Sequence, residues 1–426
     1  MTPVTAFFGK TVAVMGLGKS GLSAAEALAA GGAKVWAWDD LADSRNAAEQ
    51  SGLKLTNIYQ AEWENVETLV LSPGIPDMFP SPHPIAAKAR ENDCDIICDI
   101  DLLARSNDDA QFFGITGSNG KSTTTALVGH ILYHAGMEAA VGGNIGEPVL
   151  RLDQLGNTGT YILELSSYQL ERVPSLRLTV AALLNISPDH LDRHGGMPGY
   201  VAAKRTIFDR VVPSGTAIIG MDNQECRGIS LDLMVNSSLS VQNIIPISAN
   251  GRVPGGVYVD GTTLVNDLEN RKTPLIDLAK ITNLQGRHNW QNAAAAFAVA
   301  SVAGVDEGII ADALASFPGL PHRQEIIRVL EDVSYINDSK ATNSEAAVKA
   351  LSSYQNIFWI TGGRFKEESL DVLADALSNV RHAYLIGESQ EMMGVGLDGK
   401  VSLTRSGDLE TAIHQASTAA RSWGAP

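Results

Sequence analysis

Apolar and polar positions follow two different periods along this chain. Short runs rich in β-branched residues, such as 11–15 and 34–38, are followed by stretches in which apolar residues recur every three to four positions. The short runs predict buried strands, and the longer period predicts helices. Repeated alternation of the two predicts an α/β fold with mostly parallel sheets covered on both faces.

The alternation starts afresh twice, which predicts three domains at 1–102, 103–317 and 318–426. The first series has expected strands at 11–15, 34–38, 68–71 and near 96, with helices up to 30 and at 85–90. The second has strands at 111–115, 161–165 and 178–185, with helices at 123–134, 200–208 and 292–303. The third has strands at 334–336, 357–361 and 383–386, with helices at 344–351, 370–377 and 409–422.

Composition narrows the class of protein. Apolar residues make up 44% of the chain and charged residues 19%, which is typical of a folded globular protein. The net charge of −16 repels nucleic acid and anionic membrane surfaces, so a phosphate-bearing ligand must be held by local donors. Three cysteines cannot form a disulfide framework, and the weakly polar run 293–305 is too short to span a membrane. We expect a protein of the reducing cytoplasm, without nucleic acid partners or membrane insertion.

A glycine fingerprint follows the first predicted strand. Gly16, Gly18 and Gly21 have the Gly-x-Gly-x-x-Gly spacing, which brings backbone close to a phosphate group at a helix N-terminus. Asp39 ends the second predicted strand, where dinucleotide-binding proteins place an acid for the ribose. Taken alone, this fingerprint favours an NAD-dependent oxidoreductase, with tight strand–helix packing as the structural alternative.

A second glycine-rich stretch, 116–122, lies between the strand 111–115 and a helix. Its glycines permit a loop whose amides surround phosphate, Lys121 can reach the terminal phosphates, and the Ser122 hydroxyl can bind Mg²⁺. The stretch is shorter than the usual Gly-x₄-Gly-Lys-Ser pattern, since Ile115 stands where the first glycine is expected. It therefore predicts a shortened phosphate loop that binds ATP.

Polar residues follow the next two predicted strands of this domain. Glu164 ends one strand, His190 follows another, and Lys204 lies on the following helix. Ligands gather at the carboxyl ends of parallel strands, so Glu164 and His190 are expected beside the phosphate loop. Carboxylate and imidazole groups suit Mg²⁺ that bridges ATP oxygens.

Several separated motifs, in order, resemble those of the Mur ligases of peptidoglycan synthesis. They cover almost the whole chain and are Gly16–Gly21, Ser72–Ile75, Gly114–Thr123, Gly143–Gly146, Glu164–Glu171, Asp189–Arg193, Ala203–Lys204, Gly286–Asn292, Leu320–Arg323 and Asn337–Asn343. Asp338-Ser-Lys-Ala-Thr342 looks like the branch of the family that adds D-glutamate, because branches that add other amino acids carry a histidine-containing motif there.

The resemblance implies a Rossmann-like N-terminal domain, a P-loop ATPase-type central domain and a Rossmann-like C-terminal domain. The first would bind the UDP end of the substrate rather than NAD, and the implied UDP-substrate residues are Gly18, Lys19, Ser20, Asp39, Ser72, Pro73, Gly74, Asn144 and Ser166. The implied ATP residues are Gly117, Ser118, Asn119, Gly120, Lys121, Ser122, Thr123, Asn289, Asn292, Arg323 and Asp338. Lys340, Thr342 and Lys366 would face D-glutamate.

The implied reaction joins D-glutamate to UDP-N-acetylmuramoyl-L-alanine through an acyl phosphate made with ATP. The implied catalytic residues are Lys121, Glu164, His190, Lys204 and Lys340. Two Mg²⁺ ions are expected, with ligands from Ser122, Glu164, His190 and Lys204. The lysine would act as a CO₂-derived carbamate, because an ammonium is a poor neighbour for Mg²⁺ and a carbamate offers two oxygens. A monomer is expected.

Alternatives stay open on two points, the end of the chain and the class of protein. The family's third domain continues beyond a helix like 409–422 into another strand and a serine-containing loop, and this chain ends at Pro426, before that segment. Either the chain is truncated there or the third domain lacks its last segment and with it part of the amino-acid site. The rival classes are an NAD-dependent oxidoreductase and a catalytically weak ligase-like protein that holds the nucleotides without turnover.

Overall fold

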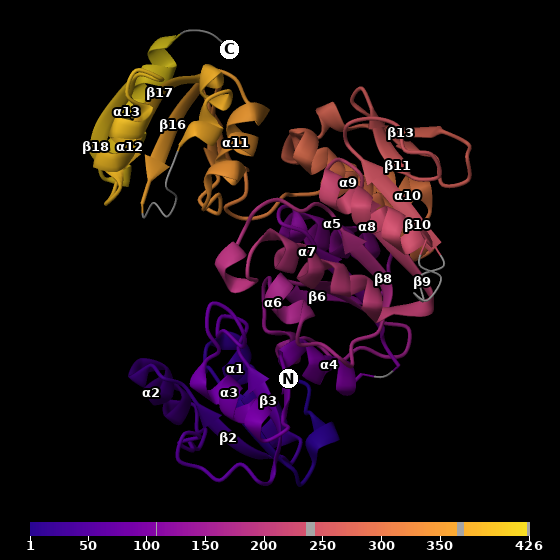
Figure 1. The fold of residues 1–426 in the computed structure, drawn as a ribbon. Helices are drawn as coiled ribbons and strands as arrows, with labels where there is room; N and C mark the ends of the chain where they lie inside the picture. The colour runs from indigo at the N-terminus through magenta and orange to yellow at the C-terminus, as the bar shows by residue number, and fades with distance from the viewer. Residues whose placement is uncertain (108, 236–242, 364–369, 424–426) are drawn as a thin grey trace. The chain divides into compact units, whose positions relative to one another are not determined.

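The computed structural model of this chain describes residues 1–107, 109–235, 243–363 and 370–423. The chain divides into two compact units. Figure 1 shows their helices and strands, coloured from indigo at the N-terminus to yellow at the C-terminus. Unit 1 comprises Met1–Ile276 and Gln291–Ser316, and unit 2 comprises Asp277–Trp290 and Phe317–Pro426.

Unit 1 begins with a four-stranded parallel sheet. Its order is β2-β1-β3-β4, from β1 (Thr11–Met15), β2 (Lys34–Trp38), β3 (Val66–Leu71) and β4 (Asp95–Ile97). Around it run the helices α1 (Lys19–Ala30), α2 (Ala42–Gln50) and α3 (Pro84–Glu91). The β-branched run of β1 is almost wholly buried, because its strand is central in the sheet and α1 packs on it. The first two strands have the predicted bounds.

A second, nine-stranded sheet forms the centre of unit 1, in the order β13-β12-β11-β10-β9-β8-β5-β7-β6. The strands are β5 (Gln111–Thr116), β6 (Ala139–Gly143), β7 (Thr160–Glu164), β8 (Leu178–Leu183), β9 (Val211–Gly220), β10 (Asn243–Ser248), β11 (Val257–Asp260), β12 (Thr263–Asn266) and β13 (Thr273–Asp277). Pairs from β6 to β11 are parallel, whereas β11 and β12 are antiparallel. The strands from β9 to β13 were not among those predicted from the sequence.

Helices and short turns connect these strands. They include α5 (Lys121–His134), α6 (Ser167–Leu170), α7 (Met197–Arg205), α8 (Gln224–Val235), α9 (Arg287–Val302) and α10 (Glu307–Ser316). Helix α9 contains most of the weakly polar run 293–305, of which 293–300 are fully buried, and the helix begins in unit 2 and ends in unit 1.

The two sheets of unit 1 share one hydrophobic core through α4 (Asp99–Arg105). A single cluster of buried side chains includes Val12 and Val14 of β1, Leu102 and Leu103 of α4, and Leu163 of β7. Helix α4 packs against α1 and against the turn Val149–Arg151. The first and second sheets therefore belong to one unit.

Unit 2 contains a hairpin and a three-stranded parallel sheet. The hairpin is β14 (Glu325–Leu330) with β15 (Val333–Asn337), and the sheet has the order β16-β17-β18. These three strands are Ile357–Gly362, Val380–Ile386 and Leu403–Gly407, and the helices are α11 (Ser344–Ser353), α12 (Gln390–Leu397) and α13 (Leu409–Trp423).

The helix predicted at 370–377 is wrong. The segment forms two 3₁₀ turns, Asp371–Leu373 and Ala376–Asn379, which bury Leu373 and Leu377 in the core of unit 2. A 3₁₀ turn also places residues i and i+3 on one side, so an apolar spacing of three to four does not distinguish it from an α-helix.

The predicted α/β class with mostly parallel sheets is confirmed. The three domain boundaries at 1–102, 103–317 and 318–426 stay predictions. Among the described residues, no helix is long and apolar enough to cross a membrane.

Candidate active site

The phosphate loop connects β5 to α5 at the carboxyl edge of the central sheet. Strand β5 lies between β7 and β8 and is parallel to both. The segments that follow the three strands therefore begin near one another, at the carboxyl edge of the sheet. Gly120 precedes α5 with a φ of +86°, and a Cβ there would lie 2.2 Å from Oδ1 of Asn292. Only glycine fits this position, and α5 begins directly after it, so the loop lies at a helix N-terminus, which favours an anion.

Neighbouring side chains hold the loop in shape. Asn185 Oδ1 accepts a hydrogen bond from the Asn119 amide at 2.9 Å, and its Nδ2 donates to the Asn119 carbonyl at 3.1 Å. Ser118 Oγ accepts from the Ser187 amide and lies 2.9 Å from the Tyr200 hydroxyl. The loop is therefore preorganised by contacts from the chain that follows β8.

Two lysines meet at one carbonyl oxygen of this loop. Lys121 Nζ donates to Gly117 O and to Ser118 O, both at 2.8 Å. Lys204 Nζ, from α7, donates to the same Gly117 O at 2.9 Å. This places two amino groups where a bound triphosphate would carry its negative charge.

Lys204 is unusual because it is buried, with an exposed fraction of 1%. Its Nζ lies 4.7 Å from the centre of the Tyr200 ring. Burial lowers the pKa of Lys204 well below its usual range, and the charge of Lys121 lowers that pKa further. The neutral amine, which is the nucleophilic form, is favoured here.

Glu164 ends β7 and is 2% exposed. Its Oε1 accepts a hydrogen bond of 2.9 Å from Asn144 Nδ2, and its main-chain oxygen accepts the Asn144 amide at 2.9 Å. Oε2 is buried and has no hydrogen-bond partner among the described residues. A buried carboxylate oxygen without a partner is costly, and a bound cation would satisfy it. Glu164 therefore fits the predicted Mg²⁺ ligand.

His190 has a different environment. Its side chain is 57% exposed, its φ is +50°, and its Nε2 lies 3.5 Å from Asp189 Oδ1. The ring centre is 5.5 Å from that of Tyr168. Within the described ranges, no group of three or more His, Cys, Asp or Glu side chains could hold a metal. The predicted ligand set of Ser122, Glu164, His190 and modified Lys204 thus stays a prediction.

The first turns of α5 carry the remaining predicted residues of this loop. Ser122 is buried, and Thr123 follows it in the helix. Asn292, near the phosphate loop, accepts a hydrogen bond of 3.2 Å from Thr124. Asn292 therefore braces α5 and the conformation of Gly120 together.

The three glycines of the fingerprint, which follow β1, have two different functions. A Cβ on Gly16 would lie 2.7 Å from the Ser72 Cβ, and one on Gly21 would lie 1.7 Å from the Gly16 carbonyl oxygen. These two glycines are needed for close packing. Gly18 has no atom within 4 Å of an added Cβ and precedes α1, so it faces the space where an anion could bind.

Asp39 and Ser20, both predicted to contact the UDP substrate, also have structural partners. Asp39 accepts hydrogen bonds from the Leu17 amide at 2.6 Å and the Leu41 amide at 2.8 Å. Ser20 lies beside Asp99, a buried carboxyl group whose two oxygens have no hydrogen-bond partner among the described residues. Lys19 begins α1 and is exposed. These contacts shape the loop and neither support nor exclude a ligand role.

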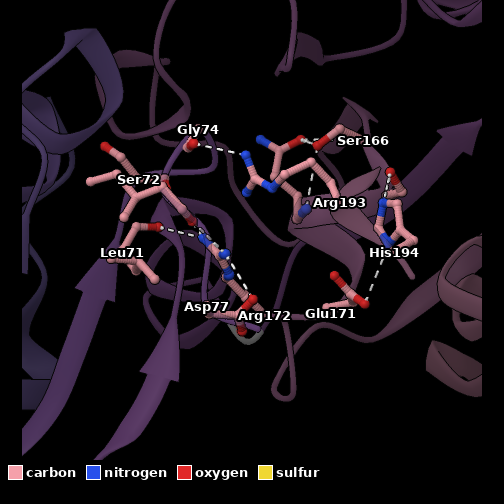
Figure 2. A network of polar contacts seen from close by, with 12 residues as sticks. Leu71, Ser72, Gly74, Asp77, Ser166, Glu171, Arg172, Arg193 and His194 are labelled. Carbon is pink, nitrogen blue, oxygen red and sulfur yellow. Dashed lines mark hydrogen bonds and ion pairs between the residues drawn. The ribbon is translucent and has the colours of Figure 1, made fainter. Parts of the chain in front are cut away.

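Figure 2 shows the loop after β3 held by two arginines, one that follows α6 and one that follows β8. Arg172 donates to the main-chain oxygens of Leu71, Ser72 and Ile75 at 3.4, 3.1 and 2.8 Å. Arg193 donates to Gly74 O at 3.0 Å. The predicted Ser72–Gly74 segment is thus brought to the residues that follow Glu164 and His190.

Aromatic and histidine side chains support this network. His194 is buried, lies 2.9 Å from Ser167 Oγ, and stacks on Tyr168 with ring centres 5.3 Å apart. Ser166 begins α6 through a capping box with Gln169. Arg172, Tyr168 and His194 were not identified from the sequence. The signal available was only that they lie within or beside the motifs 164–171 and 189–193.

The predicted residues of unit 2 form their own group. Asp338 Oδ1 accepts from the Gln324 amide at 3.0 Å, and the Lys340 amide donates to His322 O at 3.1 Å, which places Arg323 beside them. Burial raises the pKa of Asp338.

Of the other predicted residues of unit 2, Asn289 donates to Gln285 O at 2.9 Å, and Thr342 is exposed. Lys366 lies outside the described residues.

Fold and site define an α/β nucleotide-binding protein with a phosphate loop and two lysines that converge on it. Residues 115–300 match the family model described as the Mur ligase middle domain. The UDP-N-acetylmuramoylalanine–D-glutamate ligase of Caulobacter sp. (strain K31) is 47% identical over 97% of this chain and 89% of its own length. The ligase of the same name from Rhodospirillum rubrum is 46% identical over 99% of this chain and 88% of its own.

Solved structures share the fold. The UDP-N-acetylmuramate-alanine ligase MurC of Thermotoga maritima superposes with a TM-score of 0.58 at 16% identity, covering 93% of this chain and 90% of its own. A pseudomurein peptide ligase type C from Methanothermus fervidus has a TM-score of 0.58 at 17% identity, covering 98% and 95%. The chain belongs to the Mur ligase family, whose members are ATP- and Mg²⁺-dependent ligases. This membership gives no support to the NAD-dependent oxidoreductase that the glycine fingerprint left open.

Proposed function

We propose that this protein joins D-glutamate to UDP-N-acetylmuramoyl-L-alanine, using ATP, in the synthesis of peptidoglycan precursors. Similarity to D-glutamate ligases over nearly the whole chain supports the substrates. The observation that carries the proposal is the convergence of Lys121 and Lys204 on the Gly117 carbonyl of the phosphate loop. Such a loop suits phosphoryl transfer to a carboxylate, because the reacting groups are all anionic.

The proposed reaction has two steps. In the first, the alanyl carboxylate of the nucleotide sugar attacks the γ-phosphorus of ATP, and ADP leaves with the electron pair of the broken bond. In the second, the D-glutamate amine attacks the carbonyl carbon of the acyl phosphate. The amine loses a proton, phosphate leaves, and an amide bond remains.

The phosphate loop would hold ATP for the first step. Amides of Gly117 and Gly120 and the N-terminus of α5 would offer donors to the phosphates, whereas the Ser118 and Asn119 amides already donate to Asn185. Lys121 would exchange its two main-chain acceptors for phosphate oxygens. Its ammonium group would then be paired with negative charge, and its Nζ would need to move only a short distance. The loop needs little rearrangement because Asn185 and Ser118 already brace it.

Mg²⁺ would be held by Ser122, Glu164, His190 and a carbamate on Lys204. When bound, Mg²⁺ lowers the repulsion between the triphosphate and the attacking carboxylate. The buried, unpartnered Oε2 of Glu164 is the feature of this chain that suits such a cation. Two Mg²⁺ ions are proposed.

Carbamylation of Lys204 follows from the amine's environment. Reaction with CO₂ requires the neutral amine, and burial lowers the pKa of Lys204 toward that form. The reaction joins the nitrogen to the CO₂ carbon and releases one proton. An anionic carbamate would also relieve the repulsion between Lys204 and Lys121 at the shared carbonyl.

Residues of unit 2 would bind the other parts of the substrates. We propose Arg323 and Asp338 for the ATP ribose, with Asn289 and Asn292 near the adenine. We also propose Lys340, Thr342 and Lys366 for D-glutamate, whose two carboxylates call for cationic and hydroxyl donors.

The UDP end of the substrate would bind at the first sheet. Gly18, Lys19 and Ser20 offer the N-terminus of α1 to the diphosphate, and Asp39 and Ser72–Gly74 border the same loop. Asn144 and Ser166 would contact the muramoyl end. The three-domain division at 1–102, 103–317 and 318–426 corresponds to these three binding functions.

Phosphate release, measured with ATP, UDP-N-acetylmuramoyl-L-alanine and D-glutamate and with each omitted in turn, tests the proposal. Release that requires all three, together with a new amide product by mass spectrometry, is the expected result. Release with another amino acid in place of D-glutamate refutes the assigned acceptor. Binding of both nucleotides without any release favours the catalytically weak alternative.

Three buried free cysteines are consistent with a reducing cytoplasm, which we propose as the compartment. The negative net charge makes nucleic acid an improbable partner. The monomeric state stays a prediction.

A further inference from the structure

Arg172 is the largest fully buried side chain described in this protein, and the reaction proposed above gives it no role. It follows α6 and lies eight positions after Glu164. Burying a guanidinium is costly unless all of its charge is compensated. Its partners therefore identify what it is there to hold.

Those partners lie at the end of β3 and in the loop after it. Beside its three main-chain acceptors at Leu71, Ser72 and Ile75, Arg172 Nη2 lies 3.2 Å from Asp77 Oδ1. Lysine has no planar fork that could reach acceptors spread over seven residues. The arginine thus fixes the whole course of the 71–77 loop.

Arg193 makes a second attachment to the same loop. It donates to Gly74 O, between the residues that Arg172 holds, while its guanidinium lies 4.6 Å from the centre of the Tyr168 ring. Tyr168 stacks in turn on His194. This arginine is therefore held by an aromatic ring from the segment that also contains Glu164.

The held loop is packed directly on the glycine fingerprint. Ser72 Oγ donates to Gly16 O at 3.1 Å, and the side chains of Ser72 and Ile75 fill the space that a Cβ on Gly16 would need. The main chain of Arg172 also accepts the Cys98 amide at 3.1 Å, where the first sheet leads into α4. A continuous set of contacts thus joins the fingerprint loop to the segment after Glu164. Figure 2 shows the part of it from Ser72 to Arg172.

We propose that Arg172 and Arg193, here called the arginine pair, are positioning residues that set the distance between the nucleotide-sugar site and the phosphate loop. This inference rests on the proposed function, in which one substrate molecule is held at its UDP end and reacts at its carboxylate. A fixed separation lets the carboxylate reach the γ-phosphate in line. A shift of about 1 Å can cost on the order of a hundredfold in rate.

Substitutions of the pair separate this role from simple stabilisation. Arg172→Met and Arg193→Gln are expected to lower kcat at saturating substrates and to raise KM for UDP-N-acetylmuramoyl-L-alanine, each by about tenfold or more. The affinity for ADP, measured by calorimetry, should stay within about twofold, since the partners described for the pair lie in 71–77 and at Tyr168 rather than in the phosphate loop. A general loss of folded protein would instead lower the calorimetric signals for ADP and for UDP-N-acetylmuramoyl-L-alanine together.

Arg177 provides a matched control. Its guanidinium also donates to two main-chain oxygens, those of Pro174 and Leu176, but both belong to its own segment. Arg177→Met should leave kcat and both affinities unchanged. Arg172→Lys keeps the charge and serves if Arg172→Met does not fold, and it should be impaired because it cannot satisfy the four acceptors.

Folded variants of both arginines with wild-type kcat and wild-type affinity for the nucleotide sugar would overturn the inference. Failure of the proposed function looks different, because the unsubstituted protein would then release no phosphate. In that case calorimetry with UDP-N-acetylmuramoyl-L-alanine decides: weaker binding by the arginine variants alone supports the positioning role, and unchanged binding overturns it.

Discussion

Lys204 Nζ donates a hydrogen bond of 2.9 Å to the carbonyl oxygen of Gly117, a residue 87 positions earlier in the chain. The contact places a buried amine at the head of the phosphate loop. Burial lowers the pKa of this amine.

Replacement of Lys204 by alanine should abolish turnover, and added bicarbonate should not restore it. The unsubstituted protein, equilibrated with ¹³C-bicarbonate, should show a carbamate resonance that the variant lacks. Lys10→Ala is the control, because Lys10 is an exposed lysine paired with Glu67 at 2.8 Å. Wild-type turnover in Lys204→Ala, or an unchanged carbamate resonance, would contradict the modification.

Replacement of Glu164 by glutamine should raise the Mg²⁺ concentration needed for half-maximal phosphate release and lower kcat by about a hundredfold or more. Glutamine keeps the oxygen that accepts from Asn144 but removes the charge at the unpartnered Oε2. A Mg²⁺ titration of initial rates measures the change. Glu67→Gln, at an exposed position, should match the unsubstituted protein, and an identical Mg²⁺ dependence in Glu164→Gln would remove that residue from the ligand set.

Replacement of Asp99 by asparagine should stabilise the protein at pH 7.5 more than at pH 5. Burial raises the pKa of Asp99 from 3.8 to about 6. The folded state therefore binds more protons than the unfolded state between these values, and the free energy of unfolding falls as pH rises through them. At neutral pH the ionised carboxylate costs roughly 3 kcal/mol.

Urea unfolding at the two pH values measures this effect. Asp101→Asn is a matched control on the same helix, because the Asp101 carboxylate is paired with Arg105 Nε and the Ser175 amide, both at 2.7 Å. That variant should be destabilised at both values. Equal destabilisation by the two substitutions would mean that burial of Asp99 is compensated.

Acid should destabilise unit 2 through His288. Burial, together with a smaller effect of the charge of Lys349, lowers the pKa of His288 from 6.5 to about 4. Its stabilising contribution is present above pH 6.5 and is lost as pH falls toward 4, by roughly 3 kcal/mol, because the unfolded chain binds the proton more readily.

Thermal unfolding of His288→Gln between pH 7 and 4.5 should show a shallower loss of Tm than the unsubstituted protein. His322→Gln is the control, since the His322 side chain is 53% exposed. An unchanged slope in His288→Gln would assign the acid sensitivity to other groups.

Local patterns were enough to predict the elements that position the site. Strands Thr11–Met15 and Lys34–Trp38 were predicted with their observed bounds, and the phosphate loop was predicted between the correct strand and helix. The period of apolar residues and the spacing of glycines each depend on only a few neighbouring residues. Strands and loops can therefore be predicted from them without knowledge of the fold. The segment 211–276 was harder, since its short strands lie within a sheet whose pairing is set by distant partners.

By itself, the amino-acid order determined the α/β class, the two glycine loops and the family motifs, because each depends on neighbours within about one turn of backbone. Tertiary structure alone decided that Gly16 and Gly21 serve packing while Gly18 stays open, that Lys204 is buried, and that Arg172 holds a loop about 100 residues away. Burial, pKa and long-range hydrogen bonds depend on which surfaces meet when the chain folds. No local pattern carries that information.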